Sequence, residues 1–393
     1  VRLRDAQTNS LVASGGTVAI TVATGDGSIS TVTNNNDGTY TATYTSGTVV
    51  GTKTISASVN SATLTDNEQV TLVPGPATKL RITQQPTGTS SGTALGTQPI
   101  VEITDAFNNR VTGDSSTQVT AAISSGTGGT LGGARTITAA VGLATFTDVT
   151  LAGLVSQSYK LTFSSGSLTV IESSAMSVTP GVAVASTSTI SASSTSITAN
   201  GSTTSLITVQ LKDAQGNSLT TSGGTVGMRI ASGTGTLDSV SNVGNGTYTS
   251  TYTSSQVAGA IEIRASLGGV ELTEFQNLTL TPGAATKLAI YQAPISQRSG
   301  EVLSTQPKIS VQDQFGNVVT GDSGRVVTVA IAAGNGGSLD GTLTASTVNG
   351  IATFTNVVLA GITTSNYVLS FTTPNLTSVN SGVLTVSSGS AQV

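Results

Sequence analysis

The chain has 393 residues and contains neither histidine nor cysteine, which excludes histidine-based acid–base catalysis, thiol nucleophiles, disulfides and His/Cys metal sites. Only 9% of the residues are charged and the net charge is -4, so no basic surface for nucleic acid or an anionic membrane is expected. Serine, threonine and asparagine supply the polar surface instead, which we interpret as the neutral surface of an extracellular protein.

The whole chain repeats with a period of 208 residues and without a gap. Asp5 recurs as Asp213, Tyr40 as Tyr248 and Phe146 as Phe354, so that residues 1–185 align with residues 209–393. A long fixed period predicts a repeat architecture, which usually provides length and surface rather than one catalytic pocket. We therefore expect a structural or binding protein and no enzyme activity.

The first predicted elements are a short strand and a tight turn at residues 5–9, which recur at residues 213–217. An aspartate opens each turn because its carboxylate accepts backbone N–H groups, and glycine or asparagine takes the left-handed position. Thr8 departs from this pattern, so we expect the first turn to be distorted or of another type. The turn residues of this first domain type are Asp5 and Asn9 in one copy and Asp213, Gly216 and Asn217 in the other.

A strand in which tyrosine alternates with threonine follows each of these turns. Tyr40 and Tyr44 face one way in the first copy, and Tyr248 and Tyr252 repeat the design in the second. Alternation with a period of two predicts a half-buried strand, and we expect the tyrosines in the core of a sandwich. A ladder of tyrosines that stack on a ligand is the alternative reading of the same pattern.

The second domain type has its own aspartate-led turn and a strand that carries a core phenylalanine. The turn residues are Asp105 and Asn109 in one copy and Asp313, Gly316 and Asn317 in the other, and the core residues are Phe146 and Phe354. Two aspartates flank one loop in each copy: Asp105 with Asp114, and Asp313 with Asp322. They are weak candidates for calcium ligands, but we expect them to cap turns, and we expect no cofactor.

Short Pro–Gly links divide the chain into predicted domains at residues 1–75, 76–181, 182–283 and 284–393. About 100 residues is the usual size of an immunoglobulin-like sandwich, and no window has a sustained helical period. We therefore predict an all-β chain of tandem immunoglobulin-like β-sandwiches in an A-B-A-B order. The short links favour a semi-rigid rod.

The first domain lacks the first strand that its second copy contains at residues 186–208. Two interpretations stay open. Either the sequence is a window cut from a longer array, or a neighbouring molecule completes the open sheet edge by adding a strand.

The first-type motifs, Asp-Ala-x-Gly-Asn at Asp213, Gly-Thr-Tyr at Tyr248 and the Pro–Gly link, resemble the bacterial immunoglobulin-like repeats of invasin- and intimin-type proteins. The second-type motifs, Ala-Thr-Lys-Leu before Arg81 and Asp-x-Phe-x-Asn at Asp105, resemble repeats of very large bacterial surface adhesins. The resemblance covers essentially the whole chain. It implies extracellular stalks, spacers, adhesins, and in some cases filament or layer subunits.

Three hypotheses for the function follow. The first is a set of spacer domains of a bacterial cell-surface adhesin, and the second is the subunit of a self-assembling extracellular filament, sheath or surface layer. The third, a carbohydrate-binding accessory module, lacks the aromatic platform it would need, since the chain has no tryptophan. The expected partners are further repeats of the same chain, the chain itself in a polymer, and a host or matrix surface bound through regions outside this sequence.

Overall fold

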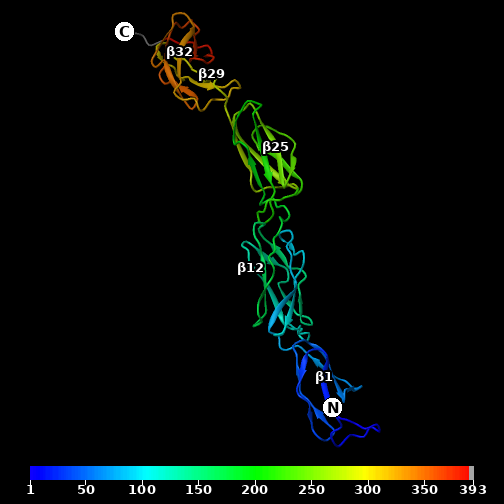
Figure 1. Ribbon diagram of the computed structural model, residues 1–393. Helices are drawn as coiled ribbons and strands as arrows, with labels where there is room; N and C mark the ends of the chain where they lie inside the picture. The colour runs from blue at the N-terminus through cyan, green and yellow to red at the C-terminus, as the bar shows by residue number, and fades with distance from the viewer. Residues whose placement is uncertain (389–393) are drawn as a thin grey trace. The chain divides into compact units, whose positions relative to one another are not determined.

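The computed structural model describes residues 1–388, and its regular elements throughout that range are β-strands (Figure 1). No helix occurs between residues 1 and 388. It follows that none of the described segments is a helix long and apolar enough to cross a membrane. The chain forms two compact units, Val1–Gly181 and Val182–Val393, which are described in turn.

In residues 1–75 the largest sheet is built around one long central strand. This strand, β6 (Gly51–Val59), pairs with β1 (Val18–Thr24) on one side and β8 (Glu68–Leu72) on the other. The hairpin strand β7 (Ala62–Thr63) follows it. Two short antiparallel pairs complete this part: β2 (Gly27–Ile29) with β5 (Tyr44–Ser46), and β3 (Thr33–Asn34) with β4 (Tyr40–Thr41).

The hydrophobic cluster of residues 1–75 is small. Only Leu3, Val18 and Tyr40 are buried in it. Tyr44, which was predicted to be a core residue, is half-buried. Its copy Tyr252 is fully buried beneath a paired strand, whereas residues 1–3 contribute only one isolated bridge beside β4. Tyr252 is therefore more buried than Tyr44 because a neighbouring strand, β21, pairs with its own strand.

Residues 76–181 form three sheets around a larger core. The first sheet has the order β15 (Leu143–Thr145), β11 (Ile100–Thr104), β9 (Lys79–Gln84). The second has the order β14 (Thr136–Thr138), β12 (Gln118–Ser125), β17 (Lys160–Ser164), β18 (Ile171–Glu172). The third has the order β10 (Thr93–Ala94), β16 (Thr150–Ala152), β13 (Thr130–Gly132). Phe146 and Phe163 pack between them with ring centroids 5.5 Å apart.

In the second unit, residues 182–283 form two five-stranded sheets. One contains β19 (Thr189–Ala192), β21 (Thr204–Gln210), β25 (Thr247–Ser254), β23 (Gly235–Leu237) and β24 (Ser241–Gly244). The other contains β20 (Ser196–Thr198), β28 (Gln276–Thr281), β26 (Gly259–Leu267), β22 (Val226–Ser232) and β27 (Val270–Glu271). Along β25 every second residue is buried, which places Tyr248 and Tyr252 in the core.

The described residues from 284 onward form one seven-stranded and one three-stranded sheet. The larger has the order β29 (Lys287–Gln292), β31 (Lys308–Gln312), β35 (Ile351–Thr353), β34 (Thr344–Val348), β32 (Val326–Ala333), β37 (Val368–Thr372), β38 (Val379–Asn380). The smaller has the order β30 (Glu301–Val302), β36 (Val358–Ala360), β33 (Ser338–Asp340). Phe354 and Phe371 pack at 5.6 Å, as Phe146 and Phe163 do.

Strand pairings recur 208 residues apart in the same register. The β1–β6 pairing, with Val18 opposite Val59, corresponds to β22–β26, with Val226 opposite Leu267. Both ladders carry an irregularity at the same place, after Val22 in one and after Ile230 in the other. Each of the four predicted segments holds a hydrophobic cluster of its own. The domain boundaries themselves stay a prediction.

Candidate functional site

The aspartate-led turns have one internal hydrogen-bond pattern. At Asp105 the backbone N–H groups of Phe107 and Asn109 both donate to Oδ1 at 2.9 Å, and Asn109 Nδ2 donates to Oδ2 at 2.9 Å. The turns at Asp5, Asp213 and Asp313 have the same three bonds. One carboxylate therefore organises each five-residue turn.

The first turn corrects the expectation that Thr8 distorts it. Thr8 has a φ of 67° and donates its N–H to the Asp5 carbonyl at 3.0 Å, the position that Asn108 fills in the second type of turn. The bonds from Asn9 and Gln7 to the Asp5 carboxylate hold the turn in this form. They offset the strain of about 1–2 kcal/mol that a left-handed residue adds.

Hydrogen bonds keep these carboxylates ionised. Donation from the Asn109 side chain, above all, lowers the pKa of Asp105 to about 2. Burial raises the pKa of Asp313, but hydrogen bonds from Asn317 and the Gly283 N–H outweigh it, so that the pKa lies below the usual value. Asp105 and Asp313 are therefore ionised at neutral pH.

The turn at Asp105 also binds the segment that precedes it. The Gly75 N–H donates to Asp105 Oδ2 at 3.0 Å, Asn109 Nδ2 donates to the Thr48 carbonyl at 2.7 Å, and the Val50 N–H donates to Asn109 Oδ1 at 3.3 Å. We call this turn with its three bonds to the preceding segment the clamp. It joins residues about 30 to 61 positions apart in the sequence.

The second unit contains the same clamp. The Gly283 N–H donates to Asp313 Oδ2 at 2.9 Å, Asn317 Nδ2 donates to the Gln256 carbonyl at 2.8 Å, and the Ala258 N–H donates to Asn317 Oδ1 at 2.8 Å. Every partner lies 208 residues after its counterpart in the first unit. The sequence predicted the turns but missed the clamp. The residue that could have indicated the clamp is the asparagine four positions after each aspartate, because its side chain bonds both the aspartate and the preceding loop.

A hollow of about 270 Å³ lies beside the first clamp. Its walls include Thr48, Leu72, Pro76 and Phe107, and the Phe107 ring is 62% exposed. The hollow lies between the turn and the link that the clamp holds.

The calcium candidates have separate hydrogen-bond partners. Asp114 accepts from the Thr117 N–H at 2.9 Å and from Thr117 Oγ1 at 2.6 Å. Asp322 accepts from Thr347 Oγ1 at 2.8 Å and from Arg325 Nε at 2.7 Å. Among residues 1–388, no three acidic side chains gather into a group able to hold a metal ion. Asp114 thus bonds within its own turn, whereas Asp322 forms an ion pair with Arg325.

The predicted core residues point into their sandwiches, and among them Tyr44 is only half-buried. Phe146, Phe354, Tyr40, Tyr248 and Tyr252 are all less than 5% exposed. The tyrosine hydroxyls bond inward: Tyr252 Oη donates to the Thr234 carbonyl at 2.6 Å, and Tyr248 Oη donates to the Gly224 carbonyl at 2.6 Å. Side chains in these positions have no face left for a ligand.

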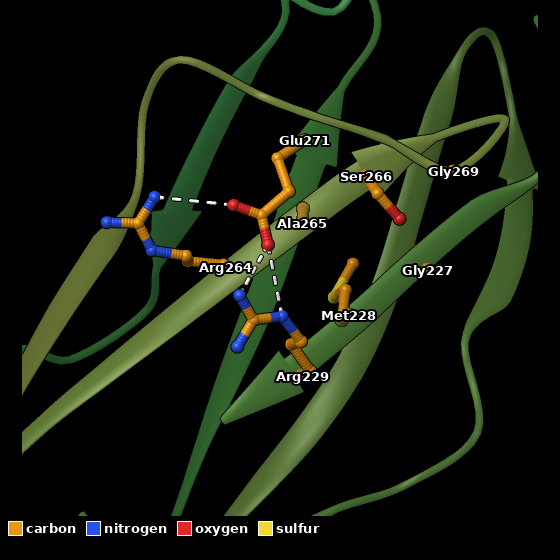
Figure 2. A pocket seen from close by; sticks show the side chains of 8 residues that line it. All are labelled: Gly227, Met228, Arg229, Arg264, Ala265, Ser266, Gly269 and Glu271. Carbon is orange, nitrogen blue, oxygen red and sulfur yellow. Dashed lines mark hydrogen bonds and ion pairs between the residues drawn. The ribbon is translucent and has the colours of Figure 1, made fainter. Parts of the chain in front are cut away.

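A second candidate site lies on the sheet of residues 182–283 and was not predicted from the sequence. Figure 2 shows Arg229 of β22 and Arg264 of β26 on either side of the Glu271 carboxylate of β27. Arg229 Nε donates to Glu271 Oε1 at 3.1 Å, and its Nη2 bonds the same oxygen. Arg264 Nη1 lies 3.5 Å from Glu271 Oε2. Glu271 thus bridges two arginines.

Neighbouring groups fix this charged cluster. Arg264 Nε donates to Glu262 Oε1 at 2.6 Å, and its guanidinium lies 5.0 Å from the centroid of the Phe275 ring. The Arg229 hydrogen bond, first of all, lowers the pKa of Glu271. The adjoining hollow has a volume of about 330 Å³ and is lined beyond the charges by Met228, Ala265, Ser266 and two glycines (Figure 2). Met228 also packs against the hydrophobic core of this sandwich.

Comparison with known proteins identifies the type of repeat. Residues 1–75 and 184–283 match the family model of invasin, domain 3. No curated protein matches the chain. The resemblance expected from the first-type turn and tyrosine motifs is confirmed for these two segments, which are similar to the immunoglobulin-like repeats of invasin.

Several solved structures are similar to this chain. The Escherichia coli adhesin FdeC is 21% identical over 80% of this chain and 100% of its own, with a TM-score of 0.35. The Yersinia pseudotuberculosis adhesin InvE is 20% identical over 52% of this chain and 60% of its own, with a TM-score of 0.29. Invasin, described as a bacterial integrin-binding protein, is 13% identical over 98% of this chain and 74% of its own, with a TM-score of 0.32.

Proposed function

We propose that these invasin-type repeats are extracellular spacer domains of a bacterial cell-surface adhesin and have no catalytic activity. The observation that carries the proposal is the clamp, which recurs with equivalent partners at residues 105–109 and 313–317. The neutral, serine- and threonine-rich composition and the match to invasin domain 3 support a place on the cell surface.

The clamp limits rotation at a junction because it acts on two separate points. Asp105 binds the link itself at Gly75, and Asn109 binds the loop that contains Thr48 and Val50. A short link anchored at both points does not behave as a free swivel. With domains at 1–75, 76–181, 182–283 and 284–393 in A-B-A-B order, each clamp holds a first-type domain to the second-type domain that follows it, which suits a spacer.

Small-angle X-ray scattering of the full chain tests this role. We compare the wild type with a double variant, Asn109→Ala with Asn317→Ala, and with a control, Asn277→Ala, whose side chain is exposed on β28. We expect the double variant to broaden the distribution of maximum dimensions and the control to match the wild type. Equal scattering from all three proteins would show that the clamp does not set the junction geometry and would remove the main support for a rigid spacer.

A second candidate is the subunit of a self-assembling filament, sheath or surface layer. The ungapped 208-residue register favours it, because identical units can offer identical contacts at a constant spacing. Light scattering after size exclusion separates the two. A monomer at all concentrations supports the spacer role, with a host or matrix surface bound elsewhere in the protein. Polymers that grow with concentration support the assembly role.

A further inference from the structure

Strand β1 (Val18–Thr24) lies at the edge of its sheet. It pairs with β6 on one side, and no other strand of residues 1–388 pairs with it. An edge strand presents a row of unpaired N–H and C=O groups on its outer side, which is a template for a further strand. β1 therefore has one side on which main-chain hydrogen bonds can still form.

The first strand that residues 1–75 lack is not the reason for this free edge. In the second copy, where residues 186–208 are present, the sheet has the order β20, β28, β26, β22, so β22 lies at the edge as β1 does. The strand β20 of that segment pairs with β28 at the opposite end of the sheet. The free side of β1 is thus a property of this domain type.

β1 has no side chain that opposes pairing. Proteins protect long edge strands with charged residues or proline, and the sequence of β1, Val-Ala-Ile-Thr-Val-Ala-Thr, contains neither. Uncharged runs of this length, rich in β-branched residues, readily pair strand to strand. Among residues 1–388, β1 is the one edge strand longer than four residues that has no charge. The other edge strands of that length, β8, β9, β22 and β29, contain Glu68, Lys79, Arg229 and Lys287.

The order of side chains along β1 complements a second copy of the same strand. The β1–β6 ladder is regular from Val18 to Val22. In an antiparallel pair of these five residues about a two-fold axis at Ile20, Val18 lies opposite Val22. On the outer face, Ala19 lies opposite Thr21. Small exposed residues therefore meet on one face, and buried or half-buried aliphatic residues meet on the other.

A second copy fits this edge better than a strand of another protein. Foreign strands are recognised through pockets that take their alternate side chains, in addition to main-chain hydrogen bonds. The exposed outer side chains of β1 are alanine and threonine, which are too small to wall such a pocket. The edge offers main-chain groups and a short aliphatic inner face, and an identical strand complements both.

Arg229 shows how the second copy is protected against the same pairing. It stands 208 residues after Thr21, at the equivalent place on β22. Its side chain is 57% exposed and is held on the sheet by the ion pair with Glu271 (Figure 2). A strand that covered this edge would remove water from the charged pair, which opposes pairing. β1 has a threonine there and no such protection.

We infer that β1 is a dimerisation site, at which two copies of the chain join their sheets through antiparallel pairing of residues 18–22. The pairing stops at two copies, because the described part of the chain has one edge strand that is both long and uncharged. A closed pair of this kind differs from the growing polymers that a filament subunit would form. The inference goes beyond the spacer role and does not depend on it.

The absence of cysteine makes cross-linking a direct test. Thr21→Cys places a single thiol on the exposed face of β1, and the control Ala122→Cys places one on β12, an interior strand of the same unit. In the pair, residue 21 of one copy is the diagonal neighbour of residue 21 of the other at about 7–8 Å, which a short bis-maleimide spans.

Each full-length variant is incubated with the bis-maleimide at about 0.1 mM protein, which is below a weak millimolar Kd. Reaction with a monofunctional maleimide corrects for differences in thiol reactivity. We expect Thr21→Cys to form covalent dimer at least about tenfold faster than Ala122→Cys, because pairing holds the two thiols at a high effective concentration.

Sedimentation velocity from about 0.05 to 0.5 mM provides the second measurement. The wild type should change reversibly from monomer to dimer and no further. Thr21→Arg introduces the residue type of β22, and because Thr63 stands where the second copy has Glu271, no carboxylate neutralises the two diagonal charges. This variant should stay monomeric. Ala122→Arg adds the same charge on an interior strand and should dimerise as the wild type does.

Three results would overturn the inference. They are equal cross-linking of Thr21→Cys and Ala122→Cys, a wild-type chain that stays monomeric or forms species larger than a dimer at about 0.5 mM, and dimerisation of Thr21→Arg at the wild-type concentration. The clamp residues Asn109 and Asn317 are not part of this edge, so the dimerisation site and the spacer role fail separately.

Discussion

Replacing Tyr248 with alanine tests the core assignment on which the repeat design depends. The side chain is 4% exposed, and its hydroxyl donates to the Gly224 carbonyl at 2.6 Å and lies 3.1 Å from Ser222 Oγ. Removing a buried aromatic side chain lowers the free energy of unfolding by about 3–5 kcal/mol, and the hydroxyl hydrogen bond accounts for about 1 kcal/mol of that loss. We expect Tyr248→Ala to destabilise residues 182–283 by about 4 kcal/mol and Tyr248→Phe by about 1 kcal/mol.

Hydrogen exchange read by mass spectrometry resolves this loss within the full chain. About 4 kcal/mol corresponds to roughly a thousandfold faster exchange for amides that exchange by global opening of the sandwich. Peptides from β25 and β26 should show it, while peptides from β12 and β17 keep their wild-type rates. Tyr291→Ala, at a 59% exposed position, is the surface control. A change below about 1 kcal/mol in Tyr248→Ala would refute the reasoning.

Three further predictions concern charge, pH and backbone. Lys53 is 4% exposed and lies 2.6 Å from Asp26, so the variant Asp26→Ala leaves a buried charge without its partner and should lower the melting temperature of the protein. The double variant Asp26→Thr with Lys53→Ile introduces the residue types of the second copy and should restore the melting temperature. The pKa of Asp105 is about 2 in the folded chain and 3.8 in the unfolded chain, so the ionised carboxylate stabilises the clamp above pH 3.8 and this stability is lost as the pH falls through about 2. The scattering profile should therefore stay the same from pH 7 to 5, and the first junction should loosen near pH 2. Gly350 has a φ of 77°, and a Cβ added there would lie 2.6 Å from a backbone carbonyl oxygen, so Gly350→Ala should lower the free energy of denaturant unfolding by about 2 kcal/mol or more. In the control Gly300→Ala the new Cβ meets no atom within 4 Å, so the loss should be smaller.

Local features of the fold followed from the sequence. The Tyr–Thr alternation along β25 is the burial pattern that the structure has, because a period of two is a property of the strand itself. The turns at Asp105 and Asp313 were also predictable, since their bonds join residues two to four positions apart. Tyr44 was mispredicted because its burial depends on a strand beside it rather than on its own pattern.

Features that join segments far apart in the sequence could not be predicted from it. The clamp needs the loop at Thr48 and Val50 to reach Asn109 about 60 positions away, and a turn motif gives no information on that contact. The cluster of Arg229, Arg264 and Glu271 depends on a register between two strands and a hairpin, which alternation alone does not define. A residue-by-residue comparison of the two copies would have revealed the cluster as a difference, but not its geometry.

The chemistry of the clamp has a consequence for how such chains change over generations. The hydrogen bonds from Asn109 and Asn317 to the preceding loop join main-chain atoms of that loop, so they do not depend on its side chains, which differ between Thr48 and Gln256. These bonds require the main-chain groups of the preceding loop to be in place, but not particular side chains. Substitutions in the preceding loop that keep its main-chain path should therefore leave these hydrogen bonds in place, whatever side chains they introduce.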